Sequence, residues 1–140
     1  MNFDIVLFDF DGTLADSKED VWESVEYSCS YFNAKVPSKF KMDPSNLSLN
    51  EKELFAILCP NASKELLGEF SKRIQIHYRK INKFANTKLY PGIEKILVKL
   101  NQNNVPCFIA SNKPQEPLNK IIIENGWDQY FEKWISPDFI

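Results

Sequence analysis

Two short apolar runs, each followed at once by polar residues, constrain the fold of this chain most strongly. Ile5 to Phe8 form an unbroken apolar run that leads directly into Asp9 and Asp11. A second run, Cys107 to Ala110, leads into Ser111-Asn112-Lys113. Continuous apolar runs of this length are typical of strands buried on both faces of a parallel sheet. The sequence therefore predicts two such strands, with polar side chains at their carboxyl ends.

The residues between these two runs have helical periodicity. A first amphipathic stripe begins after Ser17, which together with Asp20 resembles a capping signal. A second helix is predicted near Asn50, with Glu53 at its third position, and a longer helix follows it. The stretch from 35 to 50 contains two prolines and is predicted to be a loop.

The alternation of helices and strands continues after this helical segment. Tyr90-Pro91-Gly92 ends the segment, and apolar spacing predicts a helix from Ile93 to Leu100. A further helix is predicted around Leu118 to Ile122, stopped by Gly126, and a short third strand at Trp134-Ile135. Strands that alternate with helices indicate an α/β fold with a parallel sheet and crossover helices.

Composition limits the class of protein. The chain has 140 residues, 44% of them hydrophobic, which is enough for one domain or one domain with an insertion. Its net charge of -2 gives no general attraction to nucleic acid or membranes, and no apolar stretch could span a bilayer. The three cysteines lack metal-ligand spacing, which predicts reduced, buried thiols: Cys29, Cys59 and Cys107. We therefore expect a cytoplasmic protein with neither nucleic acid nor membrane as partner.

The two acids at the first strand end are the main chemical signal. A single Asp or Gly after a strand is ordinary, because both residues favour turns. Asp9 and Asp11 together repel each other, and a cation or a shared proton relieves that repulsion. Mg²⁺ suits carboxylate and carbonyl oxygens, and the backbone N–H groups of Gly12 and Thr13 could cradle a phosphate. Ser111 should reach the same edge of the sheet, where ligands bind in folds of this class.

These residues carry a resemblance to a known family. The segment Val6 to Leu14 resembles the first signature motif of the haloacid dehalogenase superfamily, hhhDxDGT. The segment Phe108 to Pro114 is similar to the second motif, and its Asn-Lys-Pro ending resembles the phosphoglycolate phosphatase branch. Tyr90-Pro91-Gly92 is also typical of that branch, where the chain returns from its cap. The resemblance extends from Phe3 to about Ser136.

The resemblance implies a fold and a domain organisation. Residues 1–15 and 89–140 would form a Rossmann-like, haloacid-dehalogenase-like α/β core with a parallel sheet. Residues 16–88 would form an inserted α-helical cap that closes over the site and selects the substrate. Within that insert, the basic run Lys72 to Lys80 could contact an anionic substrate, although a solvated helix face is the favoured interpretation. His77, the only histidine, is expected to be a surface or packed residue.

The resemblance also implies roles for site residues. Asp9 would be the nucleophile that forms an aspartyl-phosphate, and Asp11 would protonate the leaving alcohol and later activate water. Asp9 and Asp11 would also hold Mg²⁺, which neutralises phosphoryl charge. The residues expected to contact the phosphate or the substrate are Gly12, Thr13, Ser111, Asn112 and Lys113.

Two parts of the family's site have no counterpart before Ile140. In the family, a lysine on a later helix and an acidic pair after a fourth strand complete the site. The acids of Asp16 to Asp20 are better explained by a helix N-terminus, and Asp138 stands alone. The fold is therefore expected to be incomplete at the C-terminus. The outer edge of the first strand would then be unpaired, which favours self-association.

The sequence thus predicts an Mg²⁺-dependent phosphomonoester hydrolase acting on a small phosphorylated metabolite, weak or inactive in this form. One alternative is a sugar-phosphate mutase of the same superfamily, such as a β-phosphoglucomutase. Another is a non-catalytic binding or interaction module that keeps the fold. Release of inorganic phosphate would distinguish the hydrolase from both alternatives.

Overall fold

The computed structural model describes residues 4–139, so Phe3, where the family resemblance begins, lies outside the described residues. The chain divides into two compact units. One unit comprises the residues up to Ser17 together with those from Thr87 onward, and the other runs from Lys18 to Asn86.

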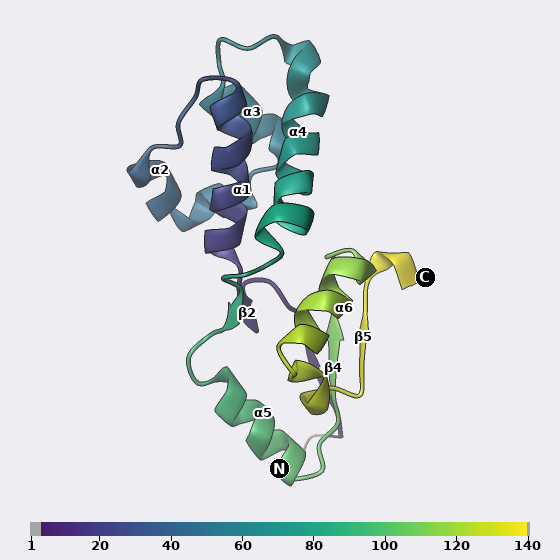
Figure 1. Cartoon of the computed structure of the whole chain (residues 1–140). Helices are drawn as coiled ribbons and strands as arrows, with labels where there is room; N and C mark the ends of the chain where they lie inside the picture. Colours follow the sequence, from purple (N-terminus) through teal and green to yellow (C-terminus); the bar gives the residue numbers. More distant parts are fainter. Residues whose placement is uncertain (1–3, 140) are drawn as a thin grey trace. The chain divides into compact units, whose positions relative to one another are not determined.

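The first unit is an α/β structure built on a three-stranded parallel sheet of order β1-β4-β5 (Figure 1). The strands are β1 (Val6–Phe8), β4 (Cys107–Ala110) and β5 (Lys133–Ile135). Phe8 lies opposite Ile109 in the register of β1 and β4, and Ile109 lies opposite Trp134 of β5. The predicted α/β fold with a parallel sheet is confirmed.

Helices link these strands. The helices and turns of this unit are α5 (Ile93–Gln102), α6 (Gln115–Glu124), η4 (Trp127–Tyr130) and η5 (Pro137–Phe139). A separate two-stranded antiparallel ribbon pairs β2 (Ala15–Asp16) with β3 (Lys88–Leu89). Tyr90 N extends this ribbon by donating to Leu14 O at 3.0 Å.

The prediction that the first strand is buried on both faces is wrong. Leu7 is 62% exposed and Ile5, just before β1, is 58% exposed. Within residues 4–139, β1 is an edge strand that pairs with β4 alone. The central strand β4 is better covered, because Cys107 and Ile109 are buried. The apolar run therefore identified the strand correctly, and the unpaired outer edge expected from the resemblance is present among residues 4–139, but the expected burial of both faces is not.

The core of this unit fixes the direction of the two acids. Phe10 is 1% exposed and its ring lies 6.3 Å from that of Trp127, between centroids. Because Phe10 points into the core, its neighbours Asp9 and Asp11 are left exposed at the end of β1. The other fully buried apolar side chains of this core include Leu14, Leu97, Ile109, Leu118, Ile121 and Ile122.

The second unit is entirely helical. Its elements are α1 (Lys18–Tyr31), α2 (Ser38–Met42), η1 (Pro44–Ser48), α3 (Glu51–Leu58), η2 (Lys64–Leu66), α4 (Leu67–Ile76) and η3 (His77–Asn82), the last a π-helical turn. Figure 1 shows α1, α3 and α4 side by side, and a common apolar core that includes Val25, Phe55 and Phe70 joins them. The predicted helix start near Asn50 is confirmed, and a capping box forms there: Asn50 Oδ1 accepts from Glu53 N at 2.8 Å, and Glu53 Oε2 accepts from Asn50 N at 3.0 Å.

The structure corrects the loop predicted from 35 to 50 and confirms that His77 is a packed residue. The predicted loop from 35 to 50 contains the short helices α2 and η1, the latter begun by Pro44 behind the capping side chain of Asp43. His77 is packed, as expected: its Nδ1 lies 2.9 Å from Ser24 Oγ and its ring stacks on Tyr27.

Of the basic run, Arg73 covers the Tyr31 ring at 3.5 Å and pairs with Glu69. Because Arg73 is engaged within its own unit, these contacts favour a solvated helix face over one that contacts an anionic substrate. No helix among residues 4–139 has both the length and the apolar character that crossing a membrane requires.

Candidate active site

A tight turn after β1 presents the two acids. Phe10 O accepts from Leu14 N at 2.9 Å and from Ala15 N at 3.0 Å, which folds the chain back on itself. Gly12 occupies this turn with φ +80°, a backbone conformation that glycine adopts without strain. The sequence Asp-Gly-Thr after the strand therefore encodes the turn as well as the acids.

The amides of this turn differ from the expected phosphate cradle. Gly12 N donates to Ala15 O at 2.9 Å, and Thr13 N donates to Phe10 O at 3.2 Å. Both N–H groups are thus engaged within the turn in this conformation, and contact of Gly12 and Thr13 with a phosphate stays a prediction. The side chain of Thr13 remains a candidate, because Thr13 is exposed.

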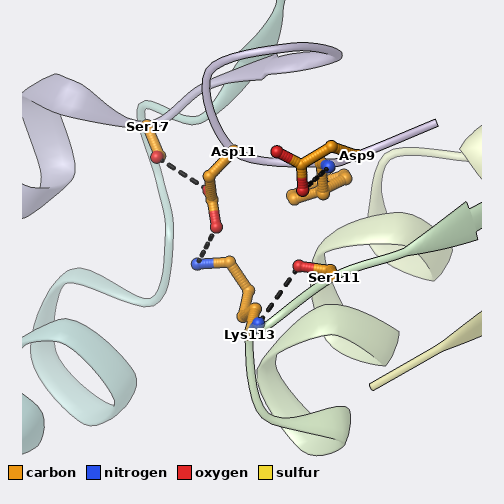
Figure 2. Close-up of polar contacts among 6 residues, drawn as sticks. Asp9, Asp11, Ser17, Ser111 and Lys113 are labelled. Atoms are coloured by element: carbon orange, nitrogen blue, oxygen red, sulfur yellow. Dashed lines mark hydrogen bonds and ion pairs between the residues drawn. The ribbon is translucent and has the colours of Figure 1, made fainter. Parts of the chain in front are cut away.

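Asp9 is held by its own neighbour. Its carboxylate Oδ1 accepts a hydrogen bond from Phe10 N at 2.8 Å (Figure 2). Since Phe10 is locked in the core, this bond gives the Asp9 carboxylate a defined orientation at the end of β1. The carboxylate is exposed, so a ligand can reach it.

Asp11 is held on both sides. Ser17 Oγ donates to Asp11 Oδ1 at 2.9 Å, and Lys113 Nζ lies 3.3 Å from Asp11 Oδ2 (Figure 2). The Lys113 side chain is 7% exposed, whereas that of Asp11 is 40% exposed. The first strand end and the loop after β4 are therefore joined by an ion pair whose cation is almost completely shielded from water.

Ser111 follows directly after β4 and is 9% exposed. Its backbone N donates to Ile135 O at 3.0 Å, which fixes the residue to β5. Its Oγ accepts from Lys113 N at 3.1 Å, and the hydroxyl hydrogen is left to donate elsewhere (Figure 2). Asn112, between these two residues, is exposed. The loop thus places a hydroxyl donor and an ammonium group beside the acids of β1.

Sequence reasoning missed Ser17. It gave Ser17 a capping role with Asp20 and no contact with Asp11, to which Ser17 Oγ donates. Asp20 is buried in the helical unit, where its carboxylate accepts from Asn86 N at 3.0 Å and from Asn86 Nδ2 at 3.0 Å. A hydroxyl can donate and accept at once, so the contact with Asp11 does not test the predicted cap, which stays a prediction.

The acids present suit a hard cation but form a small set. Within the described residues, His, Cys, Asp and Glu side chains form no group of three or more that could hold a metal. The Asp9 carboxylate and the Asp11 carbonyl are oxygen donors of the kind Mg²⁺ prefers. Mg²⁺ usually keeps several waters and binds through one or two carboxylates together with substrate phosphate, so this donor set fits it in chemistry.

The family is decided by a match over almost the whole chain. The model of the haloacid dehalogenase-like hydrolase family matches residues 6–139. The chain belongs to this family.

The curated proteins similar to this chain have names that indicate different activities. A phosphoglycolate phosphatase from Xanthomonas campestris is 29% identical over 128 residues, covering 89% of this chain and 55% of that protein. A tyrosine-protein kinase from Mycobacterium tuberculosis is 27% identical over 91% of this chain and 42% of its own length. The chain therefore spans about half the length of these relatives.

Solved structures agree on the haloacid dehalogenase-like fold. A candidate phosphatase from Clostridium difficile superposes with a TM-score of 0.84 at 25% identity, covering 97% of this chain and 61% of that one. A haloacid dehalogenase-superfamily hydrolase from Geobacter sulfurreducens superposes with a TM-score of 0.77 at 15% identity, covering 99% of this chain and 64% of that one.

Proposed function

We propose that this chain carries the nucleophile side of an Mg²⁺-dependent phosphatase site that acts on phosphomonoesters through an aspartyl-phosphate. One observation carries the proposal: Asp9 and Asp11 leave β1 beside the Ser111–Lys113 loop that follows β4, with Lys113 paired to Asp11. An exposed carboxylate next to hydroxyl and ammonium groups is the set that phosphoryl transfer requires.

Asp9 is the nucleophile in this proposal. The bond from Phe10 N holds Oδ1 and leaves the carboxylate oriented toward an approaching phosphorus. Attack on a phosphomonoester forms the aspartyl-phosphate and expels the alcohol. Water then attacks phosphorus, releases inorganic phosphate and regenerates the Asp9 carboxylate.

Asp11 moves the proton in both steps. It protonates the leaving alcohol in the first step and takes a proton from the attacking water in the second. Ser17 and Lys113 hold its two oxygens, so the carboxyl group keeps one orientation between the steps. The Lys113 ammonium has three N–H donors, so it can keep its contact with Asp11 and also donate to the phosphoryl group.

Mg²⁺ would be held by the Asp9 carboxylate and the Asp11 backbone carbonyl, and it supplies neutralisation of phosphoryl charge. On the protein side, Ser111 Oγ donates to a phosphoryl oxygen, and Lys113 provides the positive charge that the family takes from a later lysine. Asn112 and Thr13 offer further hydrogen bonds to the same group.

The proposed substrate is a small phosphorylated metabolite. The family relatives include phosphoglycolate phosphatases and, from Halalkalibacterium halodurans, a pyrophosphatase, all of which act on small phosphate compounds by their names. The helical unit from Lys18 to Asn86 serves as the cap that selects among such compounds. Reduced, buried cysteines fit a cytoplasmic location.

A non-catalytic module that keeps the fold is the second candidate, and it would release no inorganic phosphate. A third candidate, the sugar-phosphate mutase, would return an isomerised sugar phosphate instead of inorganic phosphate. Measured release of phosphate therefore separates the hydrolase from both.

The test compares the wild-type chain with Asp9→Asn and with the control Asp128→Asn, whose carboxyl group is exposed on η4. Each protein is incubated with Mg²⁺ and a chromogenic phosphomonoester. The proposal predicts turnover by the wild type and the control, and a loss of at least about a thousandfold in Asp9→Asn. Equal rates in all three proteins, or no turnover by the wild type, would contradict it.

A further inference from the structure

Helix α6 begins with a residue that cannot cap it. Its N-cap is Pro114, which has no polar side chain, and the first N–H groups of a helix need acceptors. Asp138, from η5, supplies one: its Oδ2 accepts from Gln115 N at 2.9 Å. A carboxylate at this position also complements the positive end of the helix dipole.

The side chain of Gln115 is fixed as firmly as its backbone. Its Oε1 accepts from Ser136 Oγ at 2.8 Å, and its Nε2 donates to Asn119 Oδ1 at 2.8 Å. Trp134 Nε1 donates to the same Asn119 oxygen at 2.6 Å. Residues just at and after β5 thus hold the first turn of α6 at several points.

This network acts on the loop that carries Ser111 and Lys113. The loop is fixed at one end by the bond from Ser111 N to Ile135 O. It is fixed at the other end by the bond from Gln115 N to Asp138. Only three residues, 112 to 114, lie between these two anchors, and the middle one is Lys113, which pairs with Asp11. Movement of the first turn of α6 would therefore move Lys113.

We propose that Asp138 is a positioning residue of the candidate active site, which holds the 111–114 loop so that Lys113 stays aligned with Asp11 and the phosphoryl group. This inference rests on the proposed function for its catalytic consequence. Sequence reasoning considered Asp138 only as a substitute metal ligand, and its contact with Gln115 gives it this different role.

The competing explanation is that Asp138 only caps helix α6. The two explanations differ in whether removing the Asp138 carboxylate also affects Lys113. Asp138→Ala removes the acceptor, whereas Asp138→Asn retains an oxygen that can accept from Gln115 N. The matched control is Asp128→Ala, on the exposed side of η4. If Asp138 only caps the helix, Asp138→Ala should lower the free energy of unfolding and leave the conformation of the 111–114 loop unchanged. Phosphate affinity should then fall only as far as the larger unfolded fraction explains.

The first measurement needs no activity. In amide NMR spectra of the whole chain, Asp138→Ala should speed hydrogen exchange at Gln115 about tenfold, as expected for a lost cap. It should also shift the resonances of Ser111, Asn112 and Lys113, and Asp138→Asn should restore both. Unshifted loop resonances in Asp138→Ala, with Gln115 exchange accelerated, would overturn the proposal even if the chain is not a phosphatase.

The second measurement is a double-mutant cycle on inorganic phosphate affinity with Mg²⁺ present. Asp138→Ala should weaken phosphate binding about fivefold to tenfold in the wild-type background and not at all in a Lys113→Met background. Equal weakening in both backgrounds would overturn the role through Lys113. If the wild type binds no phosphate, the proposed function fails, and the loop resonances alone decide the positioning role.

Discussion

Lys113 Nζ lies 3.3 Å from Asp11 Oδ2, and the side chain of Lys113 is almost fully shielded while that of Asp11 is half-exposed. The pair joins two strand ends that are about a hundred residues apart in the sequence, as in the parallel register of β1 and β4. A shielded ammonium without its partner is costly, so the two members of the pair should respond differently to removal.

Asp11→Ala should destabilise the chain by about 1 kcal/mol or more, because it leaves the Lys113 ammonium without this carboxylate. Lys113→Met should cost less, since it removes the shielded charge and leaves Asp11 to water; the half-exposure of Asp11 keeps both values small. Urea denaturation of the two variants and the wild type checks the order. A greater loss in Lys113→Met than in Asp11→Ala would contradict this description of the pair.

Gly12→Ala should destabilise the chain by about 1 kcal/mol, because Gly12 has φ +80° and an alanine is strained there. A Cβ at Gly12 would meet no atom within 4 Å, so the cost comes from the backbone alone. Gly68→Ala is the matched control: Gly68 lies in α4, also with space for a Cβ, and there alanine should stabilise by about 0.5 to 1 kcal/mol. Thermal melting measures both, and changes of the same sign would refute the argument.

The three cysteines should resist thiol reagents until the chain unfolds. Burial raises the pKa of Cys29 from 9.0 to about 12, with the nearby Cys59 adding to the effect, and burial also raises the pKa values of Cys59 and Cys107. We expect slow labelling by a chromogenic disulfide at pH 8, with three thiols reacting promptly in denaturant. Prompt labelling of all three in the native chain would be incompatible with their burial.

The same shift predicts a direction for stability against pH. Since the folded thiol of Cys29 holds its proton above the unfolded value of 9.0, its contribution is complete below pH 9 and is lost as the pH rises toward about 12. Cys29→Ala should therefore show a shallower fall in the free energy of unfolding above pH 9 than the wild type. Parallel slopes would argue against the shift.

The outer edge of β1 should promote pairing with a second copy of the chain. Among residues 4–139 this edge has no strand partner, and Ile5 and Leu7 beside it are more than half exposed. Light scattering should detect self-association that rises with concentration and that Leu7→Lys reduces. A wild-type chain that stays monomeric at high concentration would contradict this prediction.

The sequence predicted the strands and the position of Asp9 and Asp11 after β1, because these depend on local patterns. The apolar runs located β1 and β4, and Asn50 with Glu53 located the start of α3. The apolar pattern alone predicted a strand covered on both faces, whereas the unpaired outer edge was expected from the family resemblance, and the exposure of Leu7 accompanies that edge position.

The contacts that hold the site were also beyond prediction from sequence. Ser17 bonds Asp11, and Asp138 bonds Gln115 across 23 positions. Both contacts depend on the folded path of the chain. Ser17 already had an adequate local explanation as a capping residue, and Asp138 was considered only as a metal ligand. The engagement of the Gly12 and Thr13 amides within their own turn likewise depends on the folded path of the chain.

The most direct test of the central claim, that Asp9 is a phosphoryl-accepting nucleophile, is detection of the covalent intermediate. The chain is incubated with Mg²⁺ and a reactive phosphomonoester, quenched in acid, digested and analysed by peptide mass spectrometry. The account predicts phosphate on Asp9 in the wild type, more of it in Asp11→Ala because the second step loses its base, and none in Asp9→Asn. The account would be contradicted if the wild-type chain releases phosphate while neither the wild type nor Asp11→Ala carries phosphate on Asp9.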